Sequence, residues 1–444
     1  MTTVPLIGHA SATAVVAYRG GDPILARQFL ADVVQLTHWL PEGSHVLNAC
    51  ADRYRFAVGF AASLVTQKIS LLPSTHTPEV IGFLRTFSPK VFCLTDAAMC
   101  NVDLPQIRFP VVPAPQGGAW RIPDIPAAQV AACVFTSGST GTPVPHRKTW
   151  GRLHRSVRIE AERLGLNSNG SWAILATVPQ QHMYGFETSL LLPMVTAQAF
   201  CAERPFYPAD IVARISALPR PRALVSTPVH LRTLLSTGIK LPLVDLVVAA
   251  TAPLDAELAR QVEFAFSAPL VEIYGATETG QIASRRTVQT SQWALWPGVE
   301  LAARDGATWA TGGHIEQPTA MADILELTEP GFFLLHGRSA DLVNVAGKRS
   351  SLAYLNHQLN AIPGVVDGAF FLRDGPGETS PTGVTRLGAV AVAPALSVAV
   401  IRGQLRRSLD PVFLPRPLLL VDEMPRNATG KLPLAVLKTL TTRR

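Results

Sequence analysis

The sequence is poor in cysteine and in aromatic residues, and it has no long uncharged apolar run. Its 444 residues include five cysteines without a C-x-x-C pair, so neither a disulfide framework nor a zinc site is expected. The apolar segments are interrupted by proline, glutamine or glycine well short of a membrane span, and Met1 to Ala10 contain no basic region. We therefore expect a soluble, cytoplasmic protein with no membrane partner.

The positive charge is concentrated in the last quarter of the chain. Residues Gly337 to Arg444 contain 14 Lys and Arg against 7 Asp and Glu, which accounts for the whole net charge of +7. Such a domain suits an acidic partner, for example an acidic carrier protein, although a solvated basic face without a partner has the same composition. No basic stripe interleaved with aromatic residues is present, so nucleic acid is not expected as a partner.

Hydrophobic residues make up 48% of the chain, and their spacing predicts an α/β fold. Short β-rich runs alternate with amphipathic helical windows, the pattern of a parallel sheet flanked by helices. The strand-rich stretch from Gln281 to about His336, with its Gly and Pro turns, predicts a small β subdomain. The expected strands of the alternating region are His45–Ala49, Ile69–Leu72, Val91–Leu94, Val130–Val134, Trp172–Thr177, Ala223–Ser226, Leu243–Ala249 and Leu270–Tyr274.

A loop rich in Gly, Ser and Thr follows the strand Val130–Val134 and precedes a predicted helix that begins near Trp150. It reads Phe135-Thr-Ser-Gly-Ser-Thr-Gly-Thr-Pro143. Glycines allow backbone N–H groups to approach an anion, and hydroxyl side chains add donors, so the loop is suited to phosphate. It lacks the spacing and the lysine of a Walker A loop. Taken alone, such a run is more often an ordinary surface loop.

Four further segments along the chain contain motifs that suit a nucleotide-binding site. They are Tyr274–Gly280 (YGATETG), the surroundings of Asp323, Gly337–Gly347 (GRSADLVNVAG) and Asn427–Lys431 (NATGK). Together with the phosphate loop, in this order, they resemble the adenylate-forming superfamily of acyl- and aryl-CoA synthetases, peptide-synthetase adenylation domains and luciferases. The short chain is most similar to stand-alone acyl- or aryl-carrier-protein ligases of aryl polyene pigment clusters.

The resemblance implies a two-domain enzyme. Residues 1–336 would form a large N-terminal domain of parallel-rich sheets flanked by helices, which binds ATP and the acid. Residues 337–444 would form a small, mobile α+β domain that carries the catalytic lysine, Lys431. Asp341 stands at the family's hinge, and Gly347 would approach the site when the small domain rotates for thioester formation. A linker Asp that caps a turn is the plainer interpretation of Asp341.

The resemblance also implies roles for individual side chains. Lys431 would bridge the carboxylate and the α-phosphate, while Glu278 would help to hold Mg²⁺ and Thr277 would contact the α-phosphate. His182 would gate the acid pocket, although a core histidine without a chemical role is an equal competitor. The remaining nucleotide contacts would come from Thr136, Ser137, Gly138, Ser139, Thr140 and Gly141 around the phosphates, Ala250, Thr251, Ala252 and Tyr274 around adenine, and Asp323 and Arg338 at the ribose.

Three departures from the family pattern concern the nucleotide site. Val144 stands where a lysine commonly follows the proline of the phosphate loop. Either His146, Arg147 or Lys148 replaces its charge, or amides and hydroxyls hold the pyrophosphate alone. The usual Gly-Gly near adenine is Ala250-Thr251 here, and the usual Thr-Gly-Asp around Asp323 reads Met321-Ala322-Asp323.

The expected activity is an AMP-forming acid–thiol ligation that requires ATP and Mg²⁺. An aryl or short to medium acyl acid would become an acyl-adenylate, with release of pyrophosphate, and would then pass to the phosphopantetheine thiol of an acyl carrier protein. CoA is the alternative acceptor. A nucleotide- or acyl-adenylate-binding protein without ligase activity is the alternative from another class, because the loop lysine is missing.

Overall fold

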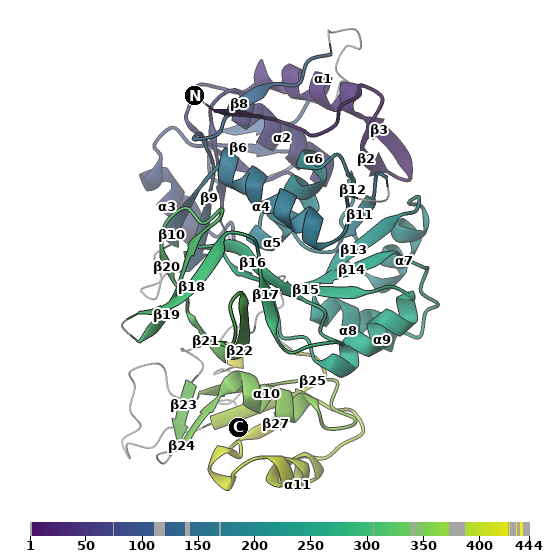
Figure 1. Cartoon of the computed structure of the whole chain (residues 1–444), viewed down its shortest axis with the longest axis vertical. Helices are drawn as coiled ribbons and strands as arrows, with labels where there is room; N and C mark the ends of the chain where they lie inside the picture. Colours follow the sequence, from purple (N-terminus) through teal and green to yellow (C-terminus); the bar gives the residue numbers. More distant parts are fainter. Residues whose placement is uncertain are drawn as a thin grey trace. The chain divides into compact units, whose positions relative to one another are not determined.

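The computed structural model describes residues 2–73, 75–110, 120–137, 143–167, 170–304, 306–338, 342–345, 348–372, 387–424, 426, 432 and 436–437. The chain divides into two compact units (Figure 1). The first consists of Met1–Ala302 with Trp309–Thr319, and the second of Ala303–Thr308 with Ala320–Arg444. Among the described residues, no helix is long and apolar enough to cross a membrane.

The smaller sheet of the first unit has the strand order β10-β9-β5-β4-β6-β7. All neighbours are parallel except β10, which forms an antiparallel hairpin with β9. Its strands are β4 (His45–Asn48), β5 (Ile69–Leu72), β6 (Phe92–Thr95), β7 (Gln106–Arg108), β9 (Val130–Ser137) and β10 (Pro143–Thr149), and a separate pair is formed by β1 (Thr3–Pro5) and β8 (Asp124–Pro126).

The larger sheet of this unit runs in the order β17-β16-β15-β14-β13-β11-β12-β2-β3. The strands from β15 to β2 are mutually parallel, while β16, β17 and β3 add antiparallel edges. The strands are β2 (Val15–Arg19), β3 (Asp22–Leu25), β11 (Ala173–Ala176), β12 (Ala199–Cys201), β13 (Arg222–Ser226), β14 (Leu246–Ala249), β15 (Leu270–Ala276), β16 (Gly280–Arg285) and β17 (Trp293–Leu295).

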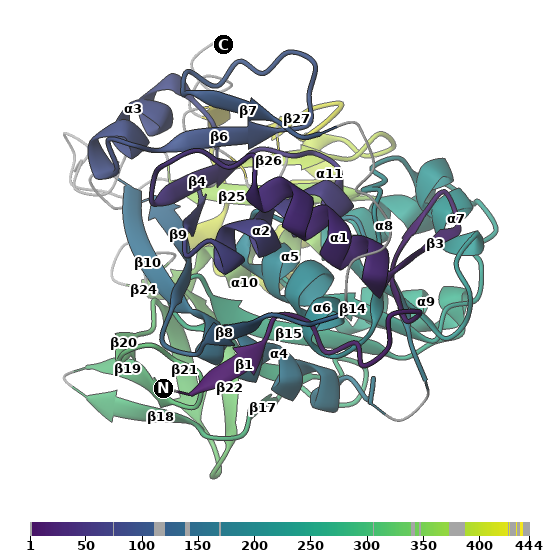
Figure 2. The ribbon, with the colours of Figure 1, turned by 90° about the horizontal axis from the view of Figure 1, so that it is seen from above.

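Helices lie on both sides of these sheets, as expected for parallel strands buried on two faces. Phe60 of α2 contacts Trp150 of α4 and Phe186 of α5, so these helices meet in one central layer (Figure 2). Apolar residues of α7, α8 and α9 pack on β11, β13 and β14, and α3 packs on the smaller sheet. The helices are α1 (Ala26–Thr37), α2 (Arg53–Val65), α3 (Pro78–Phe87), α4 (Trp150–Arg163), α5 (Met183–Phe186), α6 (Leu192–Val195), α7 (Pro208–Ser216), α8 (Pro228–Ser236) and α9 (Ala256–Phe266).

Several of these helices begin where the sequence supplies an N-cap. Asp52, Thr227 and Asp255 each accept a hydrogen bond from the backbone N–H three residues later, and Pro228 follows Thr227 at the first helical position. A side-chain oxygen at this position satisfies a backbone donor that has no partner within the helix. Each cap therefore sets the residue at which the loop from the preceding strand ends and the helix begins.

The second unit has its own core of apolar residues, which join α10 and α11 to a three-stranded sheet of order β25-β26-β27. The chain reaches it through β18 (Val299–Arg304), β19 (Ala307–Gly312) and β20 (Thr319–Ala320). Its elements are β21 (Asp323–Leu327), β22 (Phe332–Arg338), β23 (Leu342–Val345), β24 (Lys348–Ser351), α10 (Leu352–Asn360), β25 (Asp367–Leu372), β26 (Leu387–Val392), α11 (Val398–Ser408), η3 (Pro411–Phe413) and β27 (Leu418–Leu420).

The predicted α/β class with two parallel-rich sheets is confirmed, and strands β16 to β22 occupy the stretch predicted to be a β subdomain. Cys50, Cys93, Cys133 and Cys201 are free and buried, as expected for small apolar residues. The phosphate loop does not lead directly into a helix, however. The strand β10 comes first and pairs back on β9, and only then does α4 begin.

Candidate active site

Four loops of the larger sheet share one edge. They follow β11, β13, β14 and β15, which are adjacent and parallel, so their carboxyl ends lie together. In sheets of this kind the ligand binds beyond the carboxyl ends of the strands. These loops contain the predicted residues His182, Ala250 to Ala252, Thr277 and Glu278.

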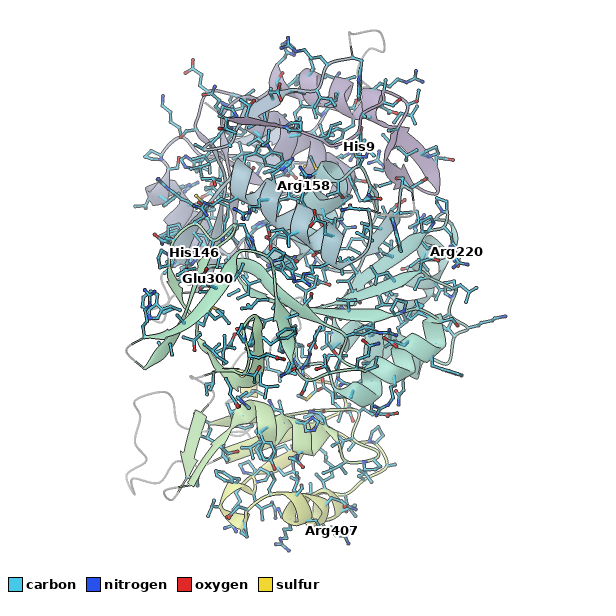
Figure 3. All side chains as sticks on the ribbon, in the orientation of Figure 1. His9, His146, Arg158, Arg220, Glu300 and Arg407 are labelled. Atoms are coloured by element: carbon cyan, nitrogen blue, oxygen red, sulfur yellow. The ribbon has the colours of Figure 1, made fainter. Side chains whose placement is uncertain are left out.

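The described part of the phosphate loop lies beside Glu278, which belongs to the other sheet. The Oγ1 of Thr136 and the Nε2 of His146, which face each other across the β9–β10 hairpin, are 2.9 Å apart and hydrogen-bonded. The same His146 Nε2 is 3.8 Å from Glu278 Oε1, and Figure 3 labels His146 on β10. Ser137 ends β9, and Gly138, Ser139, Thr140 and Gly141 lie outside the described residues.

The three basic residues after Val144 occupy different environments. Alternation along β10 places His146 and Lys148 on one face of the strand and Arg147 on the other. Burial lowers the pKa of His146, and Glu278 opposes this shift. Lys148 is only 4% exposed, and its Nζ donates to the backbone carbonyl of Glu278 at 2.7 Å. Of the three, His146 is therefore the side chain that meets Thr136 and Glu278, as a hydrogen-bonding group and not as a replacement for the missing loop charge, whereas the Nζ of Lys148 contacts the Glu278 backbone.

The turn that carries Thr277 and Glu278 is tightly held. The Thr279 Oγ1 accepts from the Ala276 N–H at 3.2 Å, and a Cβ on Gly275 would lie 2.3 Å from the Gly280 carbonyl oxygen. Only glycine allows this approach of the two strands. The Glu278 carboxylate is 36% exposed. No group of three metal-ligating side chains occurs in the described part of the chain, and the metal-binding role of Glu278 stays a prediction.

The loop after β11 is fixed on α5. A Cβ on Gly185 would lie 2.0 Å from the Pro179 carbonyl oxygen, so only glycine permits this contact. The Tyr184 hydroxyl donates to the carbonyls of Ser226 at 3.2 Å and Val248 at 3.1 Å, at the ends of β13 and β14. His182 immediately precedes α5 and is partly exposed. Its gating role stays a prediction.

The predicted adenine segment departs from ordinary backbone geometry. Thr251 has a φ of +80°, a conformation that β-branched residues rarely adopt and that is concentrated at functional sites. The family pattern that the sequence resembles has glycine here, which takes this conformation freely. Tyr274 is 7% exposed and packs on Trp293 with ring centroids 5.5 Å apart. Little of its ring is exposed, and its stacking on adenine stays a prediction.

The remaining predicted residues belong to the second unit. Asp323 and Arg338 are register partners across the β21–β22 hairpin, and their role at the ribose stays a prediction. Arg426, which directly precedes residues 427–431 in the sequence, binds both Asp367 oxygens of β25 at 2.7 Å. Asp341, Gly347 and Lys431 lie outside the described residues, and their roles stay predictions.

A buried polar cluster beneath the Glu278 turn was not predicted from the sequence. A small cavity there is lined by Lys148, Ser156, Glu187, His314 and others. Burial raises the pKa of Glu187, the Lys148 charge lowers it, and the pKa is about 7. Burial also lowers the pKa of His314 to about 4, an effect that Lys148 reinforces. In the sequence these residues are single polar positions within largely apolar segments, and their spacing does not indicate that they meet.

Replacing His314 by phenylalanine should weaken the acid sensitivity of the fold. His314 has a lower pKa in the folded protein than the ordinary 6.5 of the unfolded chain, so its contribution is present above pH 6.5 and is lost as the pH falls toward 4. The free energy of unfolding should fall about 3 kcal/mol less in His314→Phe than in the wild type between pH 7.5 and 4. Urea titrations at each pH measure this, with exposed His38→Phe as the control, and parallel curves would contradict it.

The architecture defines an α/β protein whose ligand-facing loops lie at the carboxyl ends of parallel strands. Residues 45–322 match the family model described as AMP-binding enzyme. This match covers more than half of the chain, and the chain belongs to the AMP-binding enzyme family.

The chain is similar to several CoA ligases. It is 31% identical over 261 residues to 4-coumarate--CoA ligase of Rhodobacter capsulatus, a match that covers 57% of this chain and 65% of the relative. It is 26% identical over 367 residues to 4-chlorobenzoate--CoA ligase of an Arthrobacter species, covering 71% of this chain and 67% of the relative. The matches thus span about two thirds of the length of these relatives.

Solved structures share the fold at low sequence identity. The o-succinylbenzoate CoA synthetase of Bacillus subtilis in complex with its acyl-adenylate intermediate has a TM-score of 0.81 at 17% identity and covers 99% of both chains. The ATP-bound MatB of Rhodopseudomonas palustris has a TM-score of 0.77 at 18% identity and covers 98% of this chain and 97% of that chain. The predicted fold is thereby confirmed over nearly the whole chain.

Proposed function

We propose that the protein is an AMP-forming acid–thiol ligase. It would join a carboxylic acid to the α-phosphate of ATP, release pyrophosphate, and pass the acyl group to a thiol. The observation that carries the proposal is the meeting of the β9–β10 hairpin of one sheet with the β15–β16 turn of the other, where His146 contacts Thr136 and lies 3.8 Å from Glu278 Oε1. This arrangement sets phosphate-binding groups beside a carboxylate, and the family and its CoA-ligase members support it.

The donor set fits a magnesium ion delivered with ATP. Mg²⁺ commonly takes one or two protein carboxylates and completes its coordination with phosphate oxygens and water, and Glu278 offers one accessible carboxylate of this kind. The bound ion supplies charge neutralisation for the triphosphate. Thr136 and Thr277 would donate to phosphate oxygens, and His146 would orient Thr136.

The chemistry is mainly electrostatic. The carboxylate oxygen attacks the α-phosphorus, the bond between the α-phosphorus and the α,β-bridging oxygen breaks, and pyrophosphate departs. Both reactants are anions. Cations and donors aimed at the developing charge therefore provide most of the acceleration. Lys431 would supply the charge at the bond that forms. The family's two-step use of its small domain is proposed here as well, with residues 337–444 carrying Lys431 and Asp341 as the hinge.

We propose an aromatic acid as the substrate. The relatives named above act, by their names, on 4-coumarate, 4-chlorobenzoate and o-succinylbenzoate. In this chain the Tyr184 hydroxyl is bound to carbonyls at the ends of β13 and β14. An aromatic ring near these strand ends supports a flat, short acid over a long chain.

We propose CoA as the thiol acceptor, because the named relatives are CoA ligases. An acyl carrier protein is the second candidate, by resemblance to the ligases of aryl polyene pigment clusters. Its specific support is the surface of α11, where Arg406 and Arg407 are exposed; Figure 3 labels Arg407. Exposed arginines on one helix suit an acidic protein partner.

Acid-dependent exchange of labelled pyrophosphate into ATP tests the proposal. A panel of hydroxycinnamic, benzoic, short, medium and long-chain acids would be compared, and we expect the aromatic acids to give the fastest exchange. ATP binding without exchange for any acid would favour the binding protein without ligase activity. The acceptor is then decided by thioester formation with CoA and with a phosphopantetheinylated carrier protein, using the best acid.

Replacing His146 by alanine should raise the apparent KM for ATP roughly tenfold with a smaller change in kcat, since it removes a hydrogen bond to a phosphate-binding hydroxyl and a polar neighbour of Glu278. Steady-state pyrophosphate release at varied ATP measures the effect. Arg147→Ala, on the opposite face of β10, is the matched control and should leave the KM unchanged. Equal KM values in His146→Ala and the wild type would show that amides and hydroxyls suffice.

A further inference from the structure

Lys148 is a lysine in an unusual position. It lies on β10, the strand that returns from the phosphate loop, and is 4% exposed. Its Nζ donates to the Glu278 backbone carbonyl at 2.7 Å, 130 residues away in sequence. Lysines are almost never buried to this extent without a partner, because removing the ammonium from water is costly. The burial of Lys148 therefore indicates a specific structural or functional role for its ammonium group.

A carboxylate accompanies this ammonium. Glu187 is 1% exposed and lines the same small cavity as Lys148. Its negative charge, with those of Glu316 and Glu278, opposes the burial-induced fall in the pKa of Lys148. Its Oε1 accepts from the Ser156 hydroxyl at 2.9 Å. Glu187 begins a π-helical segment, Glu187–Leu191, between α5 and α6, and such segments occur frequently at functional sites.

The same carboxylate touches the far end of the Glu278 turn. A Cβ on Gly280 would lie 2.9 Å from Glu187 Oε1. The backbone of Gly280 therefore approaches the carboxylate so closely that a side chain at this position would collide with it. Lys148 meets the turn at Glu278, and Glu187 meets it at Gly280. The two charges thus lie under a turn whose exposed side carries the predicted magnesium ligand.

We propose that Lys148 is a positioning residue, which acts through the Glu278 carbonyl to hold the Thr277–Glu278 turn in the orientation that binds the metal–nucleotide complex, with Glu187 as its buried counter-ion. This inference rests on the proposed function, because it assigns the geometry of the metal-binding turn. This role also explains why the ammonium of Lys148 is buried although the residue follows the phosphate loop. Lys148 would link the β9–β10 hairpin to the Thr277–Glu278 turn and would not contact phosphate.

The test separates positioning from folding. Lys148→Met alone leaves Glu187 as an unpaired buried charge and should unfold easily, so the informative variant is the double replacement Lys148→Met with Glu187→Gln. Neutral replacement of a buried ion pair often preserves stability. Arg147→Met is the matched control, because it removes a positive charge from the next residue of the same strand on the exposed face.

The dissociation constant of ATP would be measured by calorimetry with Mg²⁺ and with EDTA. The wild type and Arg147→Met should bind ATP more tightly with Mg²⁺ than with EDTA. In the folded double variant the dissociation constant with Mg²⁺ should be roughly tenfold higher than in the wild type, while the dissociation constant with EDTA should change little. A folded double variant that keeps the full gain would overturn the proposal. Magnesium-dependent binding in the wild type without acid-dependent exchange would refute the proposed function alone, so the two failures are distinguishable.

Discussion

Lys431→Ala is expected to lower the rate of acyl-adenylate formation by about 10²–10³-fold, the largest effect on activity of any single replacement in the chain. The physical reason is that attack of a carboxylate on a phosphate brings two anions together, and the proposed ammonium of Lys431 offsets their repulsion at the bond that forms. The rate is measured as acid-dependent exchange of pyrophosphate into ATP.

The second half-reaction distinguishes this role from damage to the fold. When the variant is given the chemically prepared acyl-adenylate and the thiol, thioester formation should proceed at close to the wild-type rate, because Lys431 acts only on the adenylation step. Lys438→Ala, which removes a nearby lysine outside the Asn427–Lys431 turn, is the control. Equal loss of both half-reactions, or retention of adenylation, would show that the assignment of Lys431 is wrong.

Arg53→Met is expected to lower the free energy of unfolding by about 3–5 kcal/mol, the largest stability effect in the described part of the chain. The guanidinium is completely buried and donates to four backbone carbonyls, those of Cys201, Glu203, Ala176 and Val178, at 2.9–3.2 Å. It therefore joins the ends of β11 and β12 to the start of α2. Methionine fills the space but leaves these acceptors without donors.

A neighbouring arginine on the same helix provides the comparison. The side chain of Arg55 is 37% exposed, with its Nη1 3.9 Å from Asp96 Oδ2, and Arg55→Met should cost less than about 1 kcal/mol. Urea unfolding of both variants measures the difference. If Arg53→Met were as stable as Arg55→Met, the four carbonyl contacts would not support the fold as described.

Much of the architecture follows from local sequence patterns. Apolar runs such as Leu246–Ala249 are short, continuous and bounded by turn residues, which is typical of strands buried on both faces. The N-caps Asp52 and Asp255 stand at the observed helix starts. The paired antiparallel strand β10 was missed, because Pro143, Pro145 and three basic residues hide its alternation. Its pairing with β9 is a tertiary preference that overrides local composition.

The candidate site also contains some residues that local sequence patterns predict and others that only the fold identifies. Short motifs predicted which residues to examine, and the structure brings Thr136 and Glu278 together through His146. Of the supporting residues, Lys148 was predicted only as a possible replacement for the loop charge. Glu187 and Arg53 were not predicted, because a charged residue within a β or helical window reads as solvent-exposed. Only the fold shows that each is buried with partners supplied by distant segments. A side chain's role in such a cluster is set by long-range contacts that local spacing does not encode.

Labelling of the acid oxygen tests the central claim most directly. The best acid of the panel, with oxygen-18 in its carboxylate, would be incubated with the protein, ATP, Mg²⁺ and the thiol acceptor, and the products analysed by mass spectrometry. If the carboxylate attacks the α-phosphorus, the bridging oxygen leaves with the nucleotide when the thiol takes the acyl group. The account predicts AMP that carries a single labelled oxygen atom, together with unlabelled pyrophosphate. Unlabelled AMP, or ADP with labelled phosphate, would contradict it.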